Sequence, residues 1–306
     1  MDERIKKIKQ ASWGAITGNG LLAILKIIVG LFSGSMAVIG DGIDSITDIF
    51  TSLITLITAG IISRPPDAEH PYGHQRAETI AAKVISFIIF FAGTQLFFTS
   101  IMRIINNDTA RLNSIPAIAV TIISIAGKIF LALFQSCTGK KIDSPMLIAN
   151  GKNMQGDIFL SGGVLIGLSL TWLFNLAILD LVVALVVSLW IMKSGLSIFM
   201  ETSMELMDGI KDHSIYKDIF EIVETIPGAN NPHRTRVRKL STLYIIDMDI
   251  EVDGKLSVLE AHKICEVVET EIKKKIKNIY DIMVHVEPIG NVEKHEKFGL
   301  SNNHKS

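Results

Sequence analysis

The stretch DGIDSITD, residues 41–48, places three carboxylates inside a long apolar segment, residues 34–62, that contains no Lys, Arg, Glu or His. A segment of this length and composition predicts a helix that crosses a bilayer, where each charged side chain costs about 2.5–3.5 kcal/mol on insertion scales. Asp44 and Asp48 share one face of a helix, and Asp41 lies one turn earlier on the same side. Carboxylates stacked in this way repel one another unless a cation or protons lie between them. The stretch therefore predicts a cation site inside the membrane.

Helix capping at the membrane edge is the alternative explanation for these Asp residues. It suits Asp41, because glycines flank this residue on both sides. It suits Asp48 less well, because Ile49, Phe50 and a further apolar run follow.

The same spacing of polar residues recurs in a second apolar segment, residues 146–174, where Asn150, Asn153 and Asp157 stand at the same offsets from one another. Two such segments are expected to face each other in a helical bundle and to present four oxygen-bearing side chains at one depth. The candidate ligands of this membrane site are Asp44, Asp48, Asn153 and Asp157. Whether Asp41 and Asn150 contribute to it is left open by the spacing.

The composition separates the chain into a membrane part and a part of soluble character. Of the 306 residues 48% are hydrophobic and 20% charged, and the net charge of −1 argues against a nucleic-acid partner. The only two cysteines, Cys137 and Cys265, are far apart, so neither a disulfide framework nor a thiolate metal site is expected. No cleavable signal peptide is predicted at the basic N-terminus.

Six membrane spans of about 20 apolar residues or more are predicted, at residues 12–32, 34–62, 79–105, 115–134, 146–174 and 177–199. Basic residues gather in the N-terminal arm and in the links after the second and fourth spans, which places both termini in the cytosol. The lysines within or near spans are expected to extend toward an interface; they are Lys26, Lys83, Lys128, Lys152 and Lys193. Asn19 and Asp180 are each expected to form either a hydrogen bond to another helix or a cap at the membrane interface.

The link between the second and third spans holds another candidate site. Asp67, His70 and His74 are three and four residues apart in a loop rich in turn-forming residues. Two imidazoles and a carboxylate can bind a divalent metal weakly. Solvated polar side chains on a cytosolic loop are an equally good explanation from spacing alone.

The last hundred residues predict a small α+β domain. Helices are expected at 214–225 and 257–276, the second with a capping box formed by Ser257 and Glu260, and strands at 235–239, 243–252 and 281–287. The order αββαβ gives a three-stranded sheet covered on one face by two helices. Residues 291–306 are polar and expected to be disordered. The candidate metal ligands of this domain, which could instead be scattered surface residues, are Asp249, His262, His285 and Glu287.

Taken together, four motifs make the chain resemble the cation diffusion facilitator family of divalent-metal transporters. They are DSITD at 44–48, HPYGHQRAE at 70–78, NMQGD at 153–157 and a terminal αββαβ domain ending in HVEP at 285–288. The resemblance implies a membrane all-α bundle of six transmembrane helices plus a C-terminal cytosolic α+β domain of ferredoxin- or metallochaperone-like type. It also implies a homodimer in the cell membrane, and an ion pair between Arg76 and Asp208 that locks the cytosolic domain to the membrane part.

The implied organisation is an N-terminal cytosolic arm at 1–10, a six-helix transmembrane domain at 11–200, a cytosolic metal-sensing and dimerisation domain at 201–289 and a disordered tail at 290–306. Spans two and five would hold the transport site, the loop after span two a further site, and the cytosolic domain a sensing site. The family usually exports metal from the cytosol in exchange for protons.

The substrate metal follows from the ligand types. Zinc-selective members of the family carry His at the first transport position of span five, where this chain has Asn153, and none of its eight His residues lies in a predicted span. Oxygen ligands suit Mn²⁺ better than Zn²⁺, and the site is similar to that of the manganese-exporting branch. Zn²⁺, Fe²⁺ and Co²⁺ stay open as substrates. In the cytosolic domain Asp249 stands at a common His position, which lowers the expected zinc affinity there.

Two functions of other classes also remain open. One is a membrane metal sensor or scaffold that transports nothing. The other is a metal-dependent membrane hydrolase, which would need a nucleophile or base beside the metal. The sequence contains no motif of that kind, so an enzyme is not predicted.

Overall fold

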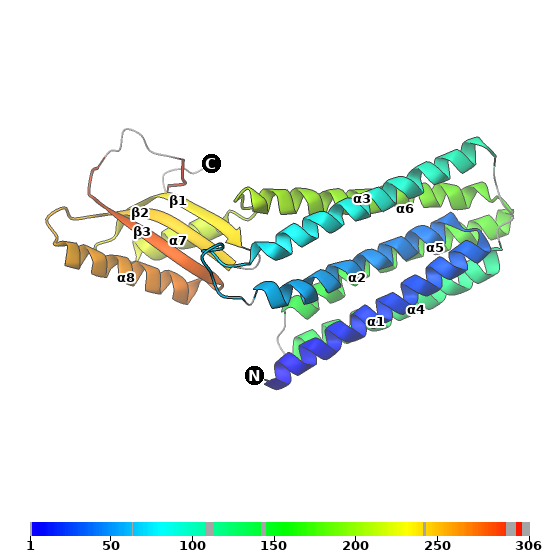
Figure 1. Ribbon diagram of the computed structural model, residues 1–306, viewed down its shortest axis with the longest axis horizontal. Helices are drawn as coiled ribbons and strands as arrows, with labels where there is room; N and C mark the ends of the chain where they lie inside the picture. Colours follow the sequence, from blue (N-terminus) through cyan, green and yellow to red (C-terminus); the bar gives the residue numbers. More distant parts are fainter. Residues whose placement is uncertain are drawn as a thin grey trace. The chain divides into compact units, whose positions relative to one another are not determined.

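The computed structural model describes residues 2–62, 64–107, 113–141, 145–240, 243–291 and 298–301. The chain divides into two compact units. The helical unit comprises Met1–Arg64 and Ile80–Met200, and the sheet unit comprises Pro65–Thr79 and Glu201–Ser306. Six long helices run through the described part of the chain (Figure 1): α1 (Asp2–Ser33), α2 (Met36–Ile62), α3 (Arg76–Ile105), α4 (Ser114–Lys141), α5 (Pro145–Phe174) and α6 (Ile178–Leu206).

Within the described residues, five of these helices are long and apolar enough to cross a membrane. The qualifying segments are Gln10–Ser33, Arg76–Ile105, Ser114–Lys141, Met154–Phe174 and Ile178–Leu206. Their outer faces carry large exposed apolar side chains, with Phe32 88% and Phe159 81% exposed, as a lipid environment requires. The predicted helical membrane region is confirmed. That α2, with 27 residues, forms the sixth span stays a prediction.

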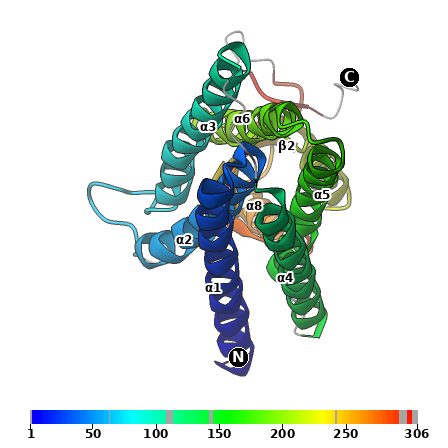
Figure 2. The same cartoon turned by 90° about the vertical axis from the view of Figure 1, so that its right-hand side faces the viewer.

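Close helix packing brings polar residues of different helices together. Helices α1, α2, α4 and α5 form one group, and α3 lies beside α6 (Figure 2). Gly42 is needed where α1 meets α2, because a Cβ at this position would lie 2.8 Å from Ile27 Cγ1. Asp180 at the start of α6 accepts a hydrogen bond of 2.8 Å from the backbone N–H of Met36 at the start of α2, which is a helix–helix hydrogen bond of the kind expected for this residue.

The sheet unit has the predicted αββαβ order. Its elements are α7 (Ser214–Glu224), β1 (Asn230–Leu240), β2 (Leu243–Val252), α8 (Val258–Lys275) and β3 (Ile279–Pro288). The strands form a sheet of order β1-β2-β3, with β1 antiparallel and β3 parallel to β2. Ile246, Met248 and Ile250 face the core together with the apolar sides of α7 and α8. The residues between them, including Asp249, therefore point to the other face of the sheet.

Part of the C-terminal tail is ordered against the edge of the sheet. Leu300 pairs with Thr235 of β1 through two backbone hydrogen bonds of 2.9 Å, one in each direction. The expected disorder of the tail therefore does not hold for residues 298–301. The other tail residues, 292–297 and 302–306, lie outside the described part of the chain.

Candidate metal-binding sites

Three of the four predicted membrane ligands converge inside the helical unit. The ammonium Nζ of Lys128, on α4, lies 4.0 Å from Asp44 Oδ2, 3.6 Å from Asp48 Oδ2 and 3.2 Å from Asp157 Oδ2. The carboxylate side chains are 10%, 17% and 12% exposed, and the Lys128 side chain is fully buried. Helices α2 and α5 thus aim three carboxylates, two buried and one mostly buried, at one point, as the repeated spacing predicts.

The fourth predicted ligand, Asn153, lies on α5 one turn before Asp157. Its side chain, like that of Asn150, lies outside the described residues. Its contribution to the site therefore stays a prediction.

The expectation that the membrane lysines extend to an interface is wrong for two of them. Lys26 and Lys128 are both fully buried. Lys128 belongs to the inward stripe of α4, with Ser124 one turn before it and Leu131 one turn after it, so its side chain points into the bundle. The carboxylates of α2 and α5 supply the opposite charge that makes a buried ammonium tolerable.

Lys26 forms a separate buried ion pair with Asp41. Its Nζ lies 2.8 Å from Asp41 Oδ2 and also donates to Ser45 Oγ at 3.1 Å. Ser161 Oγ donates to the other carboxylate oxygen, Asp41 Oδ1, at 2.7 Å. Asp41 therefore joins α1, α2 and α5 beside the three-carboxylate cluster, and its carboxylate is engaged by Lys26 rather than by Lys128.

The predicted loop site is assembled in the sheet unit. Asp67 Oδ1 lies 3.3 Å from His70 Nδ1, and Asp67 Oδ2 lies 3.4 Å from His74 Nε2. One ligand atom from each residue falls within 4.8 Å of the others, so the three can hold one metal ion. The backbone N–H of His70 donates to Asp67 at 2.7 Å and lowers the pKa of this carboxyl. The carboxylate is therefore in its metal-binding form.

Three of the candidate cytosolic ligands lie on the sheet face away from α7 and α8: Asp249, His285 and Glu287. The strand register places His233 beside Asp249 and Asp249 beside His285, in one row across the sheet. A three-residue group of His233, Asp249 and Glu287 has ligand atoms within 4.8 Å of one another. Burial raises the pKa of the Asp249 carboxyl, and the Arg234 guanidinium, 2.7 Å away, opposes this shift.

His262 was predicted to join this group; within one chain the structure does not bring it there, so its part in the site stays a prediction. It lies on α8, is 67% exposed and pairs with Glu266 at 3.6 Å. Since α8 covers the opposite face of the sheet, its side chain is separated from Asp249 by the sheet itself. His285 is also exposed, at 60%, but lies 3.6 Å from Glu287 at the rim of the group.

His233 is a member of this group that the sequence pattern did not reveal. Strand β1 begins at Asn230 rather than at residue 235, and two register shifts on either side of His233 set its direction. Its Nδ1 lies 2.7 Å from the carbonyl oxygen of Asn231, which can only accept, so Nδ1 carries the proton. Nε2 then lies on the side of Glu287, 3.5 Å away, and a metal-ligating His usually has its other ring nitrogen held by a hydrogen bond in this way.

The predicted ion pair between Arg76 and Asp208 is present within the sheet unit. The guanidinium contacts Asp208 Oδ1 and also donates to the carbonyl oxygens of Glu205 and Leu206, each at 3.2 Å. The start of α3 is thus tied to the end of α6 and the turn after it. Whether the pair controls the placement of the sheet unit stays a prediction.

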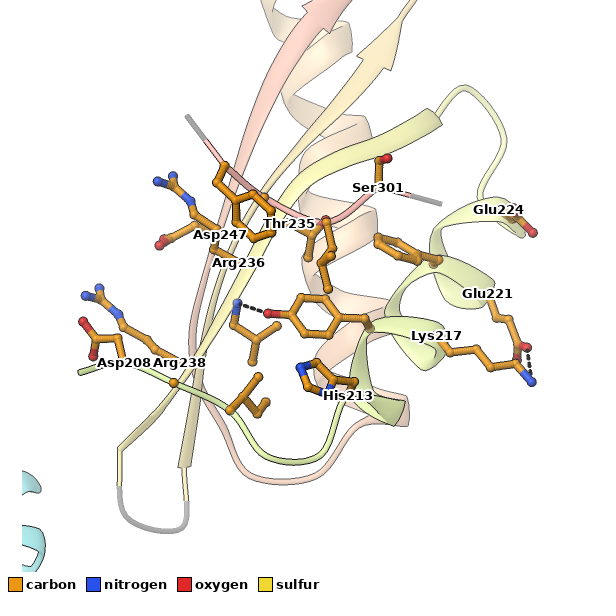
Figure 3. A pocket seen from close by; sticks show the side chains of 18 residues that line it. Asp208, His213, Lys217, Glu221, Glu224, Thr235, Arg236, Arg238, Asp247 and Ser301 are labelled. Atoms are coloured by element: carbon orange, nitrogen blue, oxygen red, sulfur yellow. Dashed lines mark hydrogen bonds and ion pairs between the residues drawn. The ribbon is translucent and has the colours of Figure 1, made fainter. Parts of the chain in front are cut away.

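A pocket between α7, β1 and residues 298–301 is a further concave feature of the sheet unit (Figure 3). Across it Val237 N–H donates to Tyr216 Oη at 3.2 Å. Its rim mixes basic side chains, such as Arg236, with acidic ones, such as Asp247. Of the predicted site residues whose side chains the structure describes, only Asp208 lines it, so the pocket is separate from the candidate metal sites.

Known protein families and relatives match nearly the whole chain. Residues 12–207 match the cation efflux transmembrane domain, and residues 212–289 match the cytoplasmic domain of cation efflux proteins. The manganese efflux system protein MneS of Bacillus subtilis is 33% identical over 295 residues, which are 94% of this chain and 99% of MneS. The cation-efflux pump FieF of Cronobacter sakazakii is 29% identical, over 92% of this chain and 93% of FieF. The magnetosome protein MamM of Magnetospirillum gryphiswaldense is 28% identical, over 91% and 88%.

Proposed function

Because the chain belongs to the cation efflux family of multi-pass membrane transporters of divalent cations, we propose that it exports Mn²⁺ from the cytosol in exchange for protons. The transport site consists of Asp44, Asp48 and Asp157, completed by Asn153. The observation that carries this proposal is the convergence of three carboxylates from α2 and α5 within 4.0 Å of one cationic atom. A position where three carboxylates surround one ammonium group is also suited to a divalent metal ion.

The choice of Mn²⁺ rests on the ligand atoms. None of the eight His residues falls in the helical unit, and the carboxylates there offer only oxygen. Hard oxygen ligands favour Mn²⁺ over Zn²⁺, which prefers nitrogen and sulfur. The name of MneS, which matches the chain over almost its full length, agrees with this choice. Zn²⁺, Fe²⁺ and Co²⁺ are the competing substrates.

Charge balance supports protons as the counter-ion. Three carboxylates around one ammonium leave the metal-free site with two negative charges, the same magnitude as the charge of the departing metal. Carboxylates crowded in this way take up protons when the metal leaves. Alternating access then carries metal outward and protons inward through the same site.

The cytosolic domain is proposed to hold two chains together as a homodimer and to sense metal through His233, Asp249 and Glu287. Its match to the family's cytoplasmic domain supports this assignment. With the sheet unit on the inside, both termini lie in the cytosol. The ion pair of Arg76 and Asp208 would then transmit the state of the sheet unit to α3 and α6.

The test is transport by the purified full chain in liposomes with an imposed proton gradient. Mn²⁺ uptake is expected, accompanied by proton movement in the opposite direction. Asp48→Ala and Asp157→Ala are expected to abolish it, and Asp218→Ala, at an exposed position on α7, to leave it unchanged. Mn²⁺-driven proton flux that survives the loss of Asp157 would contradict the site. Uptake of Zn²⁺ in preference to Mn²⁺ would contradict the metal assignment.

A second variant tests the reasoning from ligand type. Asn153→His introduces nitrogen into the site and is expected to shift transport toward Zn²⁺. An unchanged ratio of Mn²⁺ to Zn²⁺ uptake would count against it. A chain that binds metal but moves none would instead be a sensor or scaffold.

A further inference from the structure

The two buried lysines of the helical unit are held in different ways. Lys26 donates hydrogen bonds to Ser45 and to the backbone oxygen of Asp41, in addition to its ion pair. Lys128 Nζ makes no hydrogen bond within the described part of the chain, and neither do the facing oxygens, Asp44 Oδ2 and Asp157 Oδ2. Lys26 is thus fixed in place by directional contacts, whereas among the described residues Lys128 is held in its cluster by charge alone.

The position of the Lys128 ammonium is the position that a transported cation needs. Its nitrogen lies between 3.2 and 4.0 Å from one oxygen of each carboxylate. A divalent ion draws oxygen ligands in to about 2.0–2.6 Å, and it cannot share their centre with an ammonium of like charge. The metal and Lys128 therefore compete for the same three carboxylates.

We propose that Lys128 is a built-in competitor of the transported metal: its ammonium occupies the three-carboxylate site when no metal is bound and moves aside when metal enters. Its flexible four-carbon stem permits this movement. Lys128 thereby weakens metal binding and favours release, because the ammonium partly replaces the charge that the metal removes. The inference rests on the proposed function, since it assigns Lys128 a role at the proposed transport site.

A purely structural role for Lys128 is the alternative. In that case the ammonium would stay among the carboxylates in every state and support the packing of α4 against α2 and α5. Removing it would then destabilise the bundle without strengthening metal binding. Only the competing role predicts that removal of the ammonium strengthens metal binding.

Equilibrium binding of Mn²⁺ to the full chain in lipid nanodiscs separates them. The membrane component of Mn²⁺ binding is defined as the binding that is lost when Asp157→Ala is added to the original chain or to each Lys variant. Lys128→Met, which removes the charge and keeps the length, is expected to strengthen this component at least tenfold. Lys128→Arg, which keeps the charge, is expected to stay within about threefold of the original chain. The matched control Lys193→Met, at an exposed position on α6, is expected to change nothing.

A membrane component that is unchanged or weaker in Lys128→Met would overturn the inference. Thermal unfolding keeps the test informative if this variant is unstable. Mn²⁺ is expected to raise its Tm by more than that of the original chain, and a smaller rise would also overturn the inference. In liposomes Lys128→Met is expected to lower both KM and kcat for Mn²⁺, because binding tightens and release slows. A fall in kcat with KM unchanged or raised would favour the structural role and contradict the inference.

The proposed function is judged by a different result. If the original chain carries no Mn²⁺ in liposomes, the proposed transport fails. The binding comparison between Lys128→Met and the original chain still decides whether the ammonium competes with the metal, because it requires no transport.

Discussion

The buried pair of Lys26 and Asp41 gives the sharpest prediction about stability. The two charged atoms are 2.8 Å apart, and both side chains are fully buried. At an effective dielectric constant of about 20, two unit charges at this distance attract by about 6 kcal/mol. Desolvation of both ions offsets much of this attraction, yet removal of one partner leaves the other charge buried and uncompensated. The expected cost of Asp41→Asn is therefore about 3–5 kcal/mol.

Asn is the appropriate replacement because it keeps the shape of Asp41 and an oxygen that can accept from Ser161. The double variant Lys26→Met with Asp41→Asn is expected to recover most of the loss, because no unpaired charge is left in the bundle. The assay is a double-mutant cycle of unfolding free energies in detergent micelles, with Lys193→Met as the control for an exposed membrane lysine. Single changes that cost less than about 1 kcal/mol, or losses that simply add in the double variant, would refute the reasoning.

Three further predictions concern the sheet unit. Ser257→Ala removes the cap of α8. It is expected to lower the Tm for unfolding of the sheet unit by about 4–8 °C in calorimetry, and an unchanged Tm would contradict this prediction. Hydrogen bonds from Ser257 lower the pKa of Glu260. The cap therefore contributes its full stability at pH values above the ordinary pKa range of Glu, and this contribution is lost as the pH falls through the lowered pKa. The Tm difference between Ser257→Ala and the original chain is expected to shrink in acid rather than in base. His233→Ala is expected to weaken metal binding by the cytosolic group at least tenfold, whereas His213→Ala, at an exposed position before α7, serves as the control; equal effects in titration calorimetry would refute the assignment of His233.

Much of the membrane site could be predicted because its information is local. Two apolar segments, each with oxygen-bearing polar side chains four residues apart, specify which face of each helix is polar, and faces of that kind can only turn inward. The spacing therefore identified Asp44, Asp48 and Asp157 without knowledge of the bundle. The capping box of α8 is local in the same sense, since Ser257 and Glu260 are three residues apart.

The roles of the two buried lysines could not be predicted in this way. Whether Lys128 reaches an interface or the interior depends on which face of α4 meets α2 and α5, and the sequence of α4 does not contain that information. The general tendency of membrane lysines to extend toward water gave the wrong answer, because it assumes that no counter-charge lies within reach. Here three carboxylates from other helices provide one.

The cytosolic group of candidate ligands could be predicted from the sequence only in part. Alternation along β3 correctly paired His285 with Glu287 on one side of the sheet. His233 was not predicted, and His262 is not beside Asp249 within one chain, because two facts are not local: α8 covers the other face, and two register shifts turn the start of β1 toward Asp249. The pairing of Leu300 with Thr235 is likewise set by the open edge of β1 rather than by the composition of the tail.

Location of Mn²⁺ by anomalous scattering at the manganese edge, in crystals of the full chain grown with the metal, tests the central claim most directly. The account predicts a peak in the helical unit in direct contact with carboxylate oxygens of Asp48 and Asp157, with the Lys128 ammonium displaced from its metal-free position. Manganese only in the sheet unit, or a membrane peak with nitrogen or sulfur among its ligands, would contradict it.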